Sequence, residues 1–161
     1  MDSIYHWLKL VTALGSGVIA GVFFAFSTFV MRALARMPAA QGMAAMQHIN
    51  ITVINPLFML VFMGCALTSI GLIVIAMMRW SQQGALYVVL GAGLYLVGTI
   101  LVTMLGNVPL NDALAKADPA SADGIALWER YQATWMLWNH VRTIASLGAA
   151  TLLTLALYAR K

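Results

Sequence analysis

The stretch at residues 56–78, PLFMLVFMGCALTSIGLIVIAMM, is an uninterrupted apolar run that ends at Arg79 and Trp80. A helix of this length rises by about 1.5 Å per residue and so crosses a hydrocarbon core about 30 Å thick. A basic residue beside a tryptophan is typical of the point where such a helix reaches the membrane interface. The stretch therefore predicts a transmembrane helix.

Three further apolar runs of similar length follow the same pattern, at residues 10–31, 85–105 and 138–158. Basic residues flank the first and the last of these runs, as expected near a membrane surface: Arg32 and Arg36 after the first, Arg160 and Lys161 after the last. No linker or internal repeat divides the chain. We therefore predict a single all-α domain over residues 1–161, an integral membrane four-helix bundle.

The composition fits a chain that is solvated by lipid. Hydrophobic residues make up 62% of the sequence and charged residues 9%, whereas soluble domains average about 45–50% apolar and about 25% charged residues. The net charge is +4, but the nine basic residues stand singly near the ends of apolar runs rather than in a patch. This pattern argues against nucleic-acid binding and makes the lipid bilayer the expected partner. A homo-oligomer or a partner membrane protein remains open.

The connections between the predicted spans are unequal. Residues 81–84 make a tight turn, whereas residues 32–55 and 106–134 are long. Four spans place both termini on one side and the long connections on the other. Acidic residues in the second long connection favour termini on the cytoplasmic side, so we expect a multi-pass protein of a bacterial inner membrane.

The long connections contain two helix-start signals. Pro38 precedes AAQGMAAMQHIN, which predicts a short interfacial helix between the first two spans. Asp118 and Pro119 resemble an N-cap followed by a first-turn proline. They predict a fourth helix that begins well before its membrane span.

Glycines indicate where helices approach closely. Gly17 and Gly21 form a GxxxG step in the first span, which favours packing within the chain over dimerisation. Gly91 and Gly98 lie seven residues apart in the third span and predict room for large neighbours such as phenylalanines. Gly106 is expected to form a left-handed cap that ends this span.

The fourth helix carries a polar and aromatic stripe, because one of its faces displays Trp128, Gln132, Trp135, Asn139, Arg142 and Ser146. An arginine at the centre of a bilayer costs about 2.5–3.5 kcal/mol on the insertion scale, and a shallower one costs less. Either Arg142 snorkels to a lipid phosphate beside interfacial Trp135 and Trp138, or it faces a cavity together with Asn139. We expect the second arrangement, because ionisable residues inside spans usually face the protein interior.

His140 lies about 100° around the helix from Asn139. Histidine as a residue type is a common general base, although a lone histidine is more often a structural residue. A further hypothesis is haem held by His140, with His48 as a second ligand. No other cofactor and no metal site is predicted, because metal, flavin and dinucleotide signatures are missing from the sequence.

Neutral amides gather toward the same membrane face: Gln47, Asn50, Asn55, Asn107 and Asn111. Such side chains orient a polar group without the desolvation cost of a charge. Simple capping remains the alternative for two of them, since Asn55 precedes Pro56 and Asn107 follows Gly106. Together with Trp135, these amides are the predicted substrate-binding residues, whereas Asn139 is predicted to be catalytic together with His140 and Arg142.

Several motifs recur in order along nearly the whole chain: Gly21-Val-Phe-Phe-Ala-Phe-Ser27, Met46-Gln-His-Ile-Asn50, Asn55-Pro56, Asn107-Val-Pro-Leu-Asn111 and Trp135-Met-Leu-Trp-Asn-His-Val-Arg-Thr143. In this pattern the chain resembles the anthrone oxygenase-like integral membrane proteins. One departure is Arg32, which stands where that family often has proline.

The resemblance implies oxidation of an apolar aromatic, anthrone-like or quinone-like molecule. In this hypothesis Asn139 and the other amides orient the substrate, His140 removes a proton, and Arg142 stabilises an oxyanion. The rival hypothesis is a non-catalytic membrane module that binds lipid, quinone, haem or another membrane protein, because a shared fold does not establish a reaction.

Overall fold

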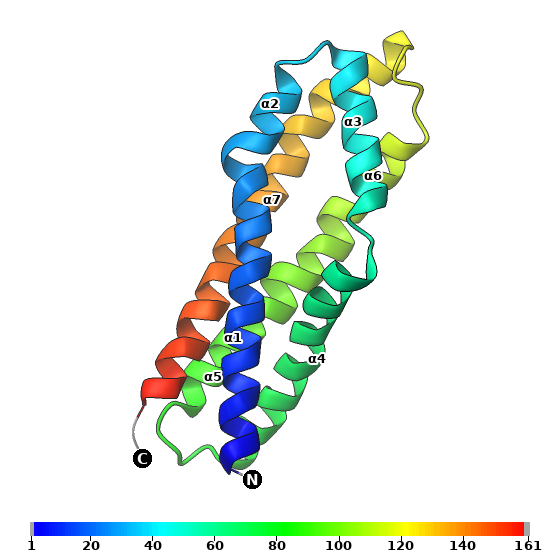
Figure 1. The fold of residues 1–161 in the computed structure, drawn as a ribbon. Helices are drawn as coiled ribbons and strands as arrows, with labels where there is room; N and C mark the ends of the chain where they lie inside the picture. The colour runs from blue at the N-terminus through cyan, green and yellow to red at the C-terminus, as the bar shows by residue number, and fades with distance from the viewer. Residues whose placement is uncertain (1, 160–161) are drawn as a thin grey trace.

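The computed structural model describes residues 2–159, which form helices and turns without a β-strand. The helices form a long bundle (Figure 1), and four helical segments of the described chain are long and apolar enough to cross a membrane. The predicted all-α membrane bundle is confirmed. Arg160 and Lys161, the predicted flank of the last span, lie outside the described residues.

The first and third spans are built from several helical pieces. The first joins α1 (Asp2–Ala25), the π-helix η1 (Phe26–Val30) and α2 (Met31–Ala35), and the second is α4 (Pro56–Met78). The third joins α5 (Ala85–Leu94), η2 (Tyr95–Leu101), η3 (Thr103–Asn107) and α6 (Val108–Ala115). The fourth is α7 (Ala122–Tyr158), and the short helix α3 (Ala39–Thr52) lies between the first two spans.

Both ends of the described chain lie at one end of the bundle, together with the turn that leads into α5 (Figure 1). The turn closes at Gly84, whose φ of 89° is left-handed and therefore favours glycine. The connections that follow α2 and α6 lie at the opposite end (Figure 1). This is the predicted path of the chain.

The bundle is longer than a bilayer is thick. The first span contains 34 residues and the fourth 37, or roughly 50–55 Å of helix against a hydrocarbon core of about 30 Å. The short helix α3 runs lengthwise and continues into α4 through residues 53–55 (Figure 1). Helices of this length exceed the hydrocarbon thickness and are accommodated by tilting or by projecting past the interface.

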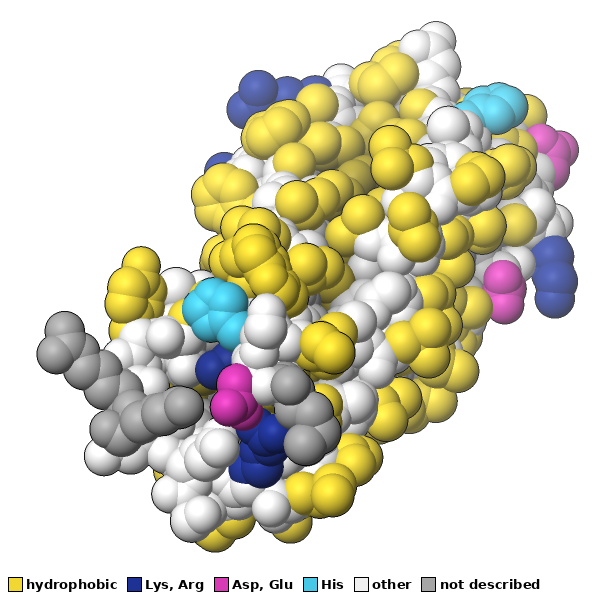
Figure 2. All heavy atoms as spheres, turned by 60° about the horizontal axis from the view of Figure 1, so that its bottom comes forward, with side chains coloured by type: hydrophobic (Ala, Val, Ile, Leu, Met, Phe, Trp, Pro, Cys, Tyr) yellow, Lys and Arg dark blue, Asp and Glu magenta, His cyan; other side chains and the backbone are white. Residues whose placement is uncertain are grey.

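Hydrophobic side chains cover much of the flank seen in Figure 2, and charged side chains gather toward the two ends. Large apolar residues such as Leu57, Leu67 and Ile144 are about 70% exposed on this bundle. A surface of this kind is suited to contact with lipid tails rather than water.

Small residues bring α7 close to the third span. A Cβ atom added at Gly98 would lie 2.4 Å from the Cβ of Ala145, and one at Gly91 would lie 3.2 Å from the carbonyl of Ala149. Gly98 therefore packs against Ala145 and Gly91 packs against Leu152, Leu153 and the Ala149 carbonyl, all on α7, rather than against the expected phenylalanines. Both glycines nevertheless allow the third span to approach α7 closely.

The prediction for the GxxxG step in α1 is wrong. A Cβ atom at Gly17 or Gly21 would meet nothing within 4 Å, so these glycines do not pack against another helix of the chain. The tight contact involves Gly15 instead, where a Cβ atom would clash with the sulfur of Cys65. Gly17 and Gly21 do share one face of the helix, as their spacing predicts. That face is not the one that packs against the rest of the chain.

Two predicted helix boundaries also differ from the structure. The third span does not end at Gly106, because η3 leads directly into α6 and Pro109 sits in the first turn of that helix. A π-helical turn changes the register of backbone hydrogen bonds, which accommodates a proline that lacks an N–H. Gly106 is needed for another reason, since a Cβ atom there would lie 2.8 Å from the ring of Trp138.

The start of α7 differs in a similar way. Asp118 and Pro119 do not cap the helix. Ser121 is the N-cap, and its hydroxyl accepts a hydrogen bond from the backbone N–H of Gly124 at 3.0 Å. The carboxylate of Asp118 instead accepts from the N–H of Ala120 in the preceding turn. The early start of the fourth helix itself is confirmed.

Candidate functional site

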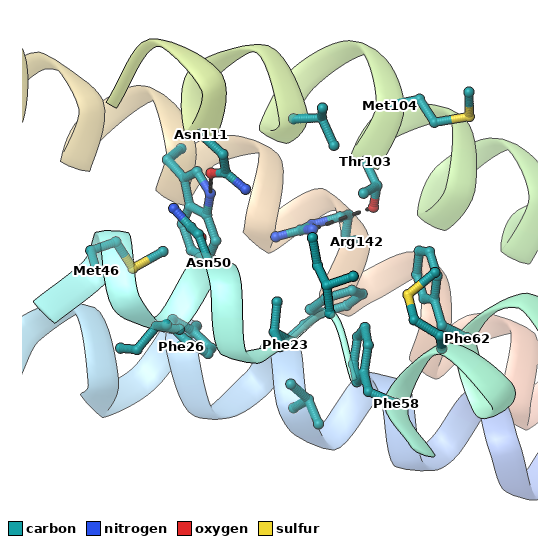
Figure 3. A pocket seen from close by; sticks show the side chains of 17 residues that line it. Phe23, Phe26, Met46, Asn50, Phe58, Phe62, Thr103, Met104, Asn111 and Arg142 are labelled. Atoms are coloured by element: carbon teal, nitrogen blue, oxygen red, sulfur yellow. Dashed lines mark hydrogen bonds between the residues drawn. The ribbon is translucent and has the colours of Figure 1, made fainter. Parts of the chain in front are cut away.

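A cavity of about 280 Å³ lies where α3 meets α4, between these helices and α1, η3, α6 and α7. Most of its walls are apolar and include Phe23, Phe26, Phe58 and Phe62. Figure 3 shows these side chains around the guanidinium group of Arg142. The cavity is therefore a hydrophobic slot with one charged group in its wall.

Arg142 faces the bundle interior and is only 5% exposed. Its Nη2 donates to Oδ1 of Asn139 at 2.8 Å, and its Nη1 donates to the hydroxyl of Thr103 at 3.3 Å. The guanidinium carbon lies 4.1 Å from the ring centre of Phe23 and 5.2 Å from that of Trp135. The predicted inward orientation is confirmed, and snorkelling to a lipid phosphate is not what the structure shows.

The guanidinium group is incompletely paired. Among residues 2–159 the ion pair found is that of Arg79 with Asp2, so no carboxylate neutralises Arg142. Its buried Nε also has no hydrogen-bond partner among these residues. A buried cation without an anion is costly, and a donor left unpaired adds about 1–3 kcal/mol. The guanidinium group of Arg142 can therefore bind an anionic or carbonyl oxygen in the cavity.

Asn139 fixes the position of the Arg142 side chain by hydrogen bonding. Its amide nitrogen donates to the carbonyl of Phe23 at 2.9 Å and to the hydroxyl of Ser27 at 2.8 Å, which turns its oxygen toward the guanidinium. The hydroxyl of Thr143 donates to the main-chain carbonyl of Asn139 at 2.8 Å. Asn139 is fully buried and does not line the cavity. It therefore positions Arg142 rather than contacting a ligand.

Two π-helical segments supply the partners of this pair. Ser27 belongs to η1, and Thr103 belongs to η3. π-helical turns are rare, occur frequently at functional sites, and re-aim side chains relative to a regular α-helix. The sequence pattern did not single out Thr103 or Phe23 for a role in the site, because neither residue is unusual in a membrane span.

A second polar group lies on the side of the cavity toward which the Arg142 guanidinium points (Figure 3). Oδ1 of Asn111 accepts hydrogen bonds from the hydroxyl of Tyr131 and from Nε1 of Trp135, both at 2.9 Å. These two donors leave the amide nitrogen of Asn111 directed toward Arg142 (Figure 3). Asn50, whose amide nitrogen lies 3.5 Å from the Tyr131 hydroxyl, also lines the cavity. The predicted approach of Asn111 to the α7 stripe is confirmed.

Three of the predicted amides have structural contacts instead. Asn107 donates to the carbonyl of Trp135 at 3.2 Å and thereby also approaches α7 as predicted. Gln47 donates to the carbonyls of Leu114 and Ala117. Asn55 caps α4 by accepting from the N–H of Phe58. None of the three lines the cavity, although Asn107 retains a buried carbonyl oxygen without a partner among the described residues.

His140 lies outside the cavity. Its side chain is exposed, and its Nδ1 is 3.0 Å from the hydroxyl of Ser27 in η1. His140 does not contact the cavity that Arg142 lines, because the 100° rotation between neighbouring residues gives it a different direction from Asn139. His48 is exposed as well, and neither histidine reaches the cavity. Within residues 2–159 no three His, Cys, Asp or Glu side chains form a potential metal cluster.

Comparison with protein families gives a match to the anthrone oxygenase family over residues 57–152, which is more than half of the chain. The chain belongs to this family. The match includes Thr103, Asn111, Trp135 and Arg142, whereas the cavity walls supplied by α1 and α3 lie outside it. Comparisons with curated proteins and with solved structures gave no significant match.

Proposed function

We propose that this family member is a membrane-embedded enzyme that oxidises a flat, apolar aromatic ketone of the anthrone type with dioxygen. The observation that carries the proposal is Arg142, a buried cation without a carboxylate partner in the wall of an apolar cavity. Fused aromatic rings match the phenylalanine and methionine walls, and a ring oxygen matches the unpaired donors of the guanidinium.

The first step is the formation of an anion. An anthrone interconverts with an enol that has a phenol-like hydroxyl, and loss of its proton to water gives a delocalised oxyanion. A fixed guanidinium in a water-poor site stabilises such an anion more strongly than water does. Arg142 thus favours the electron-rich form of the substrate, and Asn139 and Thr103 hold the guanidinium in place.

The second step is electron transfer to dioxygen. The methylene carbon of the anthrone loses two hydrogens and gains one oxygen atom, which is a four-electron oxidation. Dioxygen accepts the four electrons: one of its atoms becomes the new carbonyl oxygen and the other leaves as water. The anion donates electrons directly in this scheme, so the chain's contribution is to bind, orient and stabilise it.

The test is oxidation of anthrone by the purified protein in lipid nanodiscs. We expect quinone absorbance to appear with consumption of one dioxygen per quinone, faster than in empty nanodiscs. Arg142→Ala should abolish the difference while the protein remains folded. If the wild-type rate equals that of empty nanodiscs, the proposed reaction is wrong.

One observation favours the non-catalytic alternative. Among the described residues, those that line the cavity include no carboxylate and no histidine, so none of them is an ordinary general base for a bound molecule. A module that only binds a quinone or a related lipid-soluble molecule has no need of one. Binding of anthraquinone without any oxidation of anthrone would support this second function.

A further inference from the structure

We infer that the ligand enters the cavity sideways from the bilayer, through an opening between the α3–α4 connection and the η3–α6 segment. The inference deepens the proposed function by giving the route of the substrate, and rests on it only for the identity of the ligand. The opening is defined by three residues that both line the cavity and reach the surface: Ile54, Met104 and Val108.

The exposed fraction of the lining side chains falls steeply from these three residues to the inner wall of the cavity. Ile54 is 71% exposed, Met104 61% and Val108 40%, whereas Trp135 and Arg142 are only 4% and 5% exposed. All five line the same cavity. The cavity thus leads from an open apolar edge to the buried guanidinium group.

The surroundings of the opening are apolar too. The neighbouring side chains Ile51, Leu57 and Leu105 are each at least 70% exposed. Arg142 is the charged residue in the cavity wall, and it lies at the inner end. An edge made of exposed aliphatic side chains offers no hydrogen bonds to water and suits a molecule that arrives from lipid tails.

The depth of the opening follows from the helix lengths. The 23 residues of α4 rise by roughly 34 Å, which about equals the hydrocarbon thickness. Ile54 precedes this helix by two residues and therefore lies at one edge of the hydrocarbon. Asp112 is exposed one turn beyond Val108 and marks the aqueous side. Aromatic molecules with one polar end concentrate at this boundary.

The opening can widen at small cost. Hydrogen bonds of residues 53–55 are local, such as the N–H of Val53 to the carbonyl of Ile49 and the side chain of Asn55 to the carbonyl of Thr52. Among the described residues none joins this connection to η3 or α6. Separation of the two edges at residues 53–55 therefore breaks apolar contacts, which lipid tails replace, while the hydrogen bonds of Gln47 to the carbonyls of Leu114 and Ala117 keep the rest of α3 attached to α6 and the turn after it.

The test uses a single cysteine at the opening, Val108→Cys, in full-length protein that also carries Cys65→Ala. Leu105→Cys in the same background is the matched control, because Leu105 lies one turn away on the surface and does not line the cavity. Each protein is placed in nanodiscs and treated, or not treated, with a bulky maleimide. An apolar diazirine dissolved in the bilayer then labels accessible side chains, which are identified residue by residue.

We expect the bilayer reagent to label Trp135 in both untreated proteins, although its side chain is almost fully buried. Labelling of Trp135 should be lost when the cysteine at position 108 is modified and should persist when the one at 105 is modified. A water-soluble diazirine should leave Trp135 unlabelled. Labelling that survives modification at 108, or that arises equally from the water-soluble reagent, would overturn the inferred route.

This experiment does not depend on turnover. A protein that fails to oxidise anthrone but shows the expected labelling retains the lateral opening and loses the proposed reaction. A protein that oxidises anthrone while Trp135 is labelled regardless of position 108 retains the reaction and loses the route.

Discussion

At the scale of single residues, the site consists of two polar groups set in an apolar wall. Arg142 is held by Asn139 and Thr103, and Asn111 is held by Tyr131 and Trp135. Both groups present hydrogen-bond donors to the cavity, and Arg142 lies between Asn111 and the rings of Phe58 and Phe62 (Figure 3). A flat ring system with oxygen directed toward these donors would satisfy them.

Replacing Asn111 should separate recognition of oxygen from recognition of the rings. Asn111→Leu removes the donor of one of these two groups, so it should weaken binding of anthraquinone by about 1–2 kcal/mol, or roughly 5–30-fold. Binding of anthracene, which has the same rings without oxygen, should change little. Quenching of tryptophan fluorescence in nanodiscs measures both ligands.

The matched control for this prediction is Asp112→Asn, a neighbouring exposed substitution outside the cavity. It should leave the affinity for both ligands unchanged. An equal loss of anthracene and anthraquinone binding in Asn111→Leu would show that the residue acts through packing alone.

The stripe on α7 shows how far residue patterns predict the site. Helical spacing correctly put Trp135, Asn139 and Arg142 on one buried face, since that geometry is local. His140 was misassigned because a motif says nothing about which face of the helix meets the cavity. Thr103 and Phe23 come from other helices, and only the packed bundle brings them to Arg142.

At the scale of helices, irregular and tightly packed segments position the site. The π-helical segments η1 and η3 bring Ser27 and Thr103 to the Asn139–Arg142 pair. Such segments depend on how the whole helix packs, so an apolar sequence does not predict them. This is why the third span was expected to end at Gly106, whereas it continues to Ala115.

Close packing of the third span on α7 gives a stability prediction. Gly98→Ala places a Cβ atom 2.4 Å from that of Ala145, so it should destabilise the protein by about 1–3 kcal/mol. Thermal unfolding in detergent, followed by circular dichroism, measures the shift in midpoint.

Gly93→Ala is the control, because an added Cβ atom there meets nothing within 4 Å. Alanine favours a helix over glycine by up to about 1 kcal/mol. The midpoint should therefore stay constant or rise. A fall of the same size in both variants would mean that the contact with Ala145 is not the cause.

At the scale of the whole molecule, the apolar runs predicted the four spans and the common side of the termini, because the bilayer imposes length on each crossing. The height of the bundle, measured along its helices, was harder to predict from the sequence. That height depends on α3 stacking lengthwise above α4, and a polar-apolar pattern does not fix the direction of α3.

The path of the chain predicts opposite accessibility for two connections. Single cysteines at Gln82 and Asp112, in the Cys65→Ala background, should react with a membrane-impermeant maleimide from opposite sides of sealed vesicles. Both positions are exposed, so neither is shielded by the bundle. Labelling of both from one side would contradict the topology.

The central claim is that the planar guanidinium of Arg142 holds an oxygen of the ligand in an otherwise apolar cavity. Its most direct test is the rate of anthrone oxidation by Arg142→Lys, compared with wild type, Arg142→Ala and the exposed control Arg130→Lys. Lysine keeps the charge but loses the forked set of donors that reaches Asn139, Thr103 and the ligand at once. The account predicts that Arg142→Lys folds and yet loses oxidation nearly as fully as Arg142→Ala, while Arg130→Lys remains active. Wild-type activity in Arg142→Lys would contradict it.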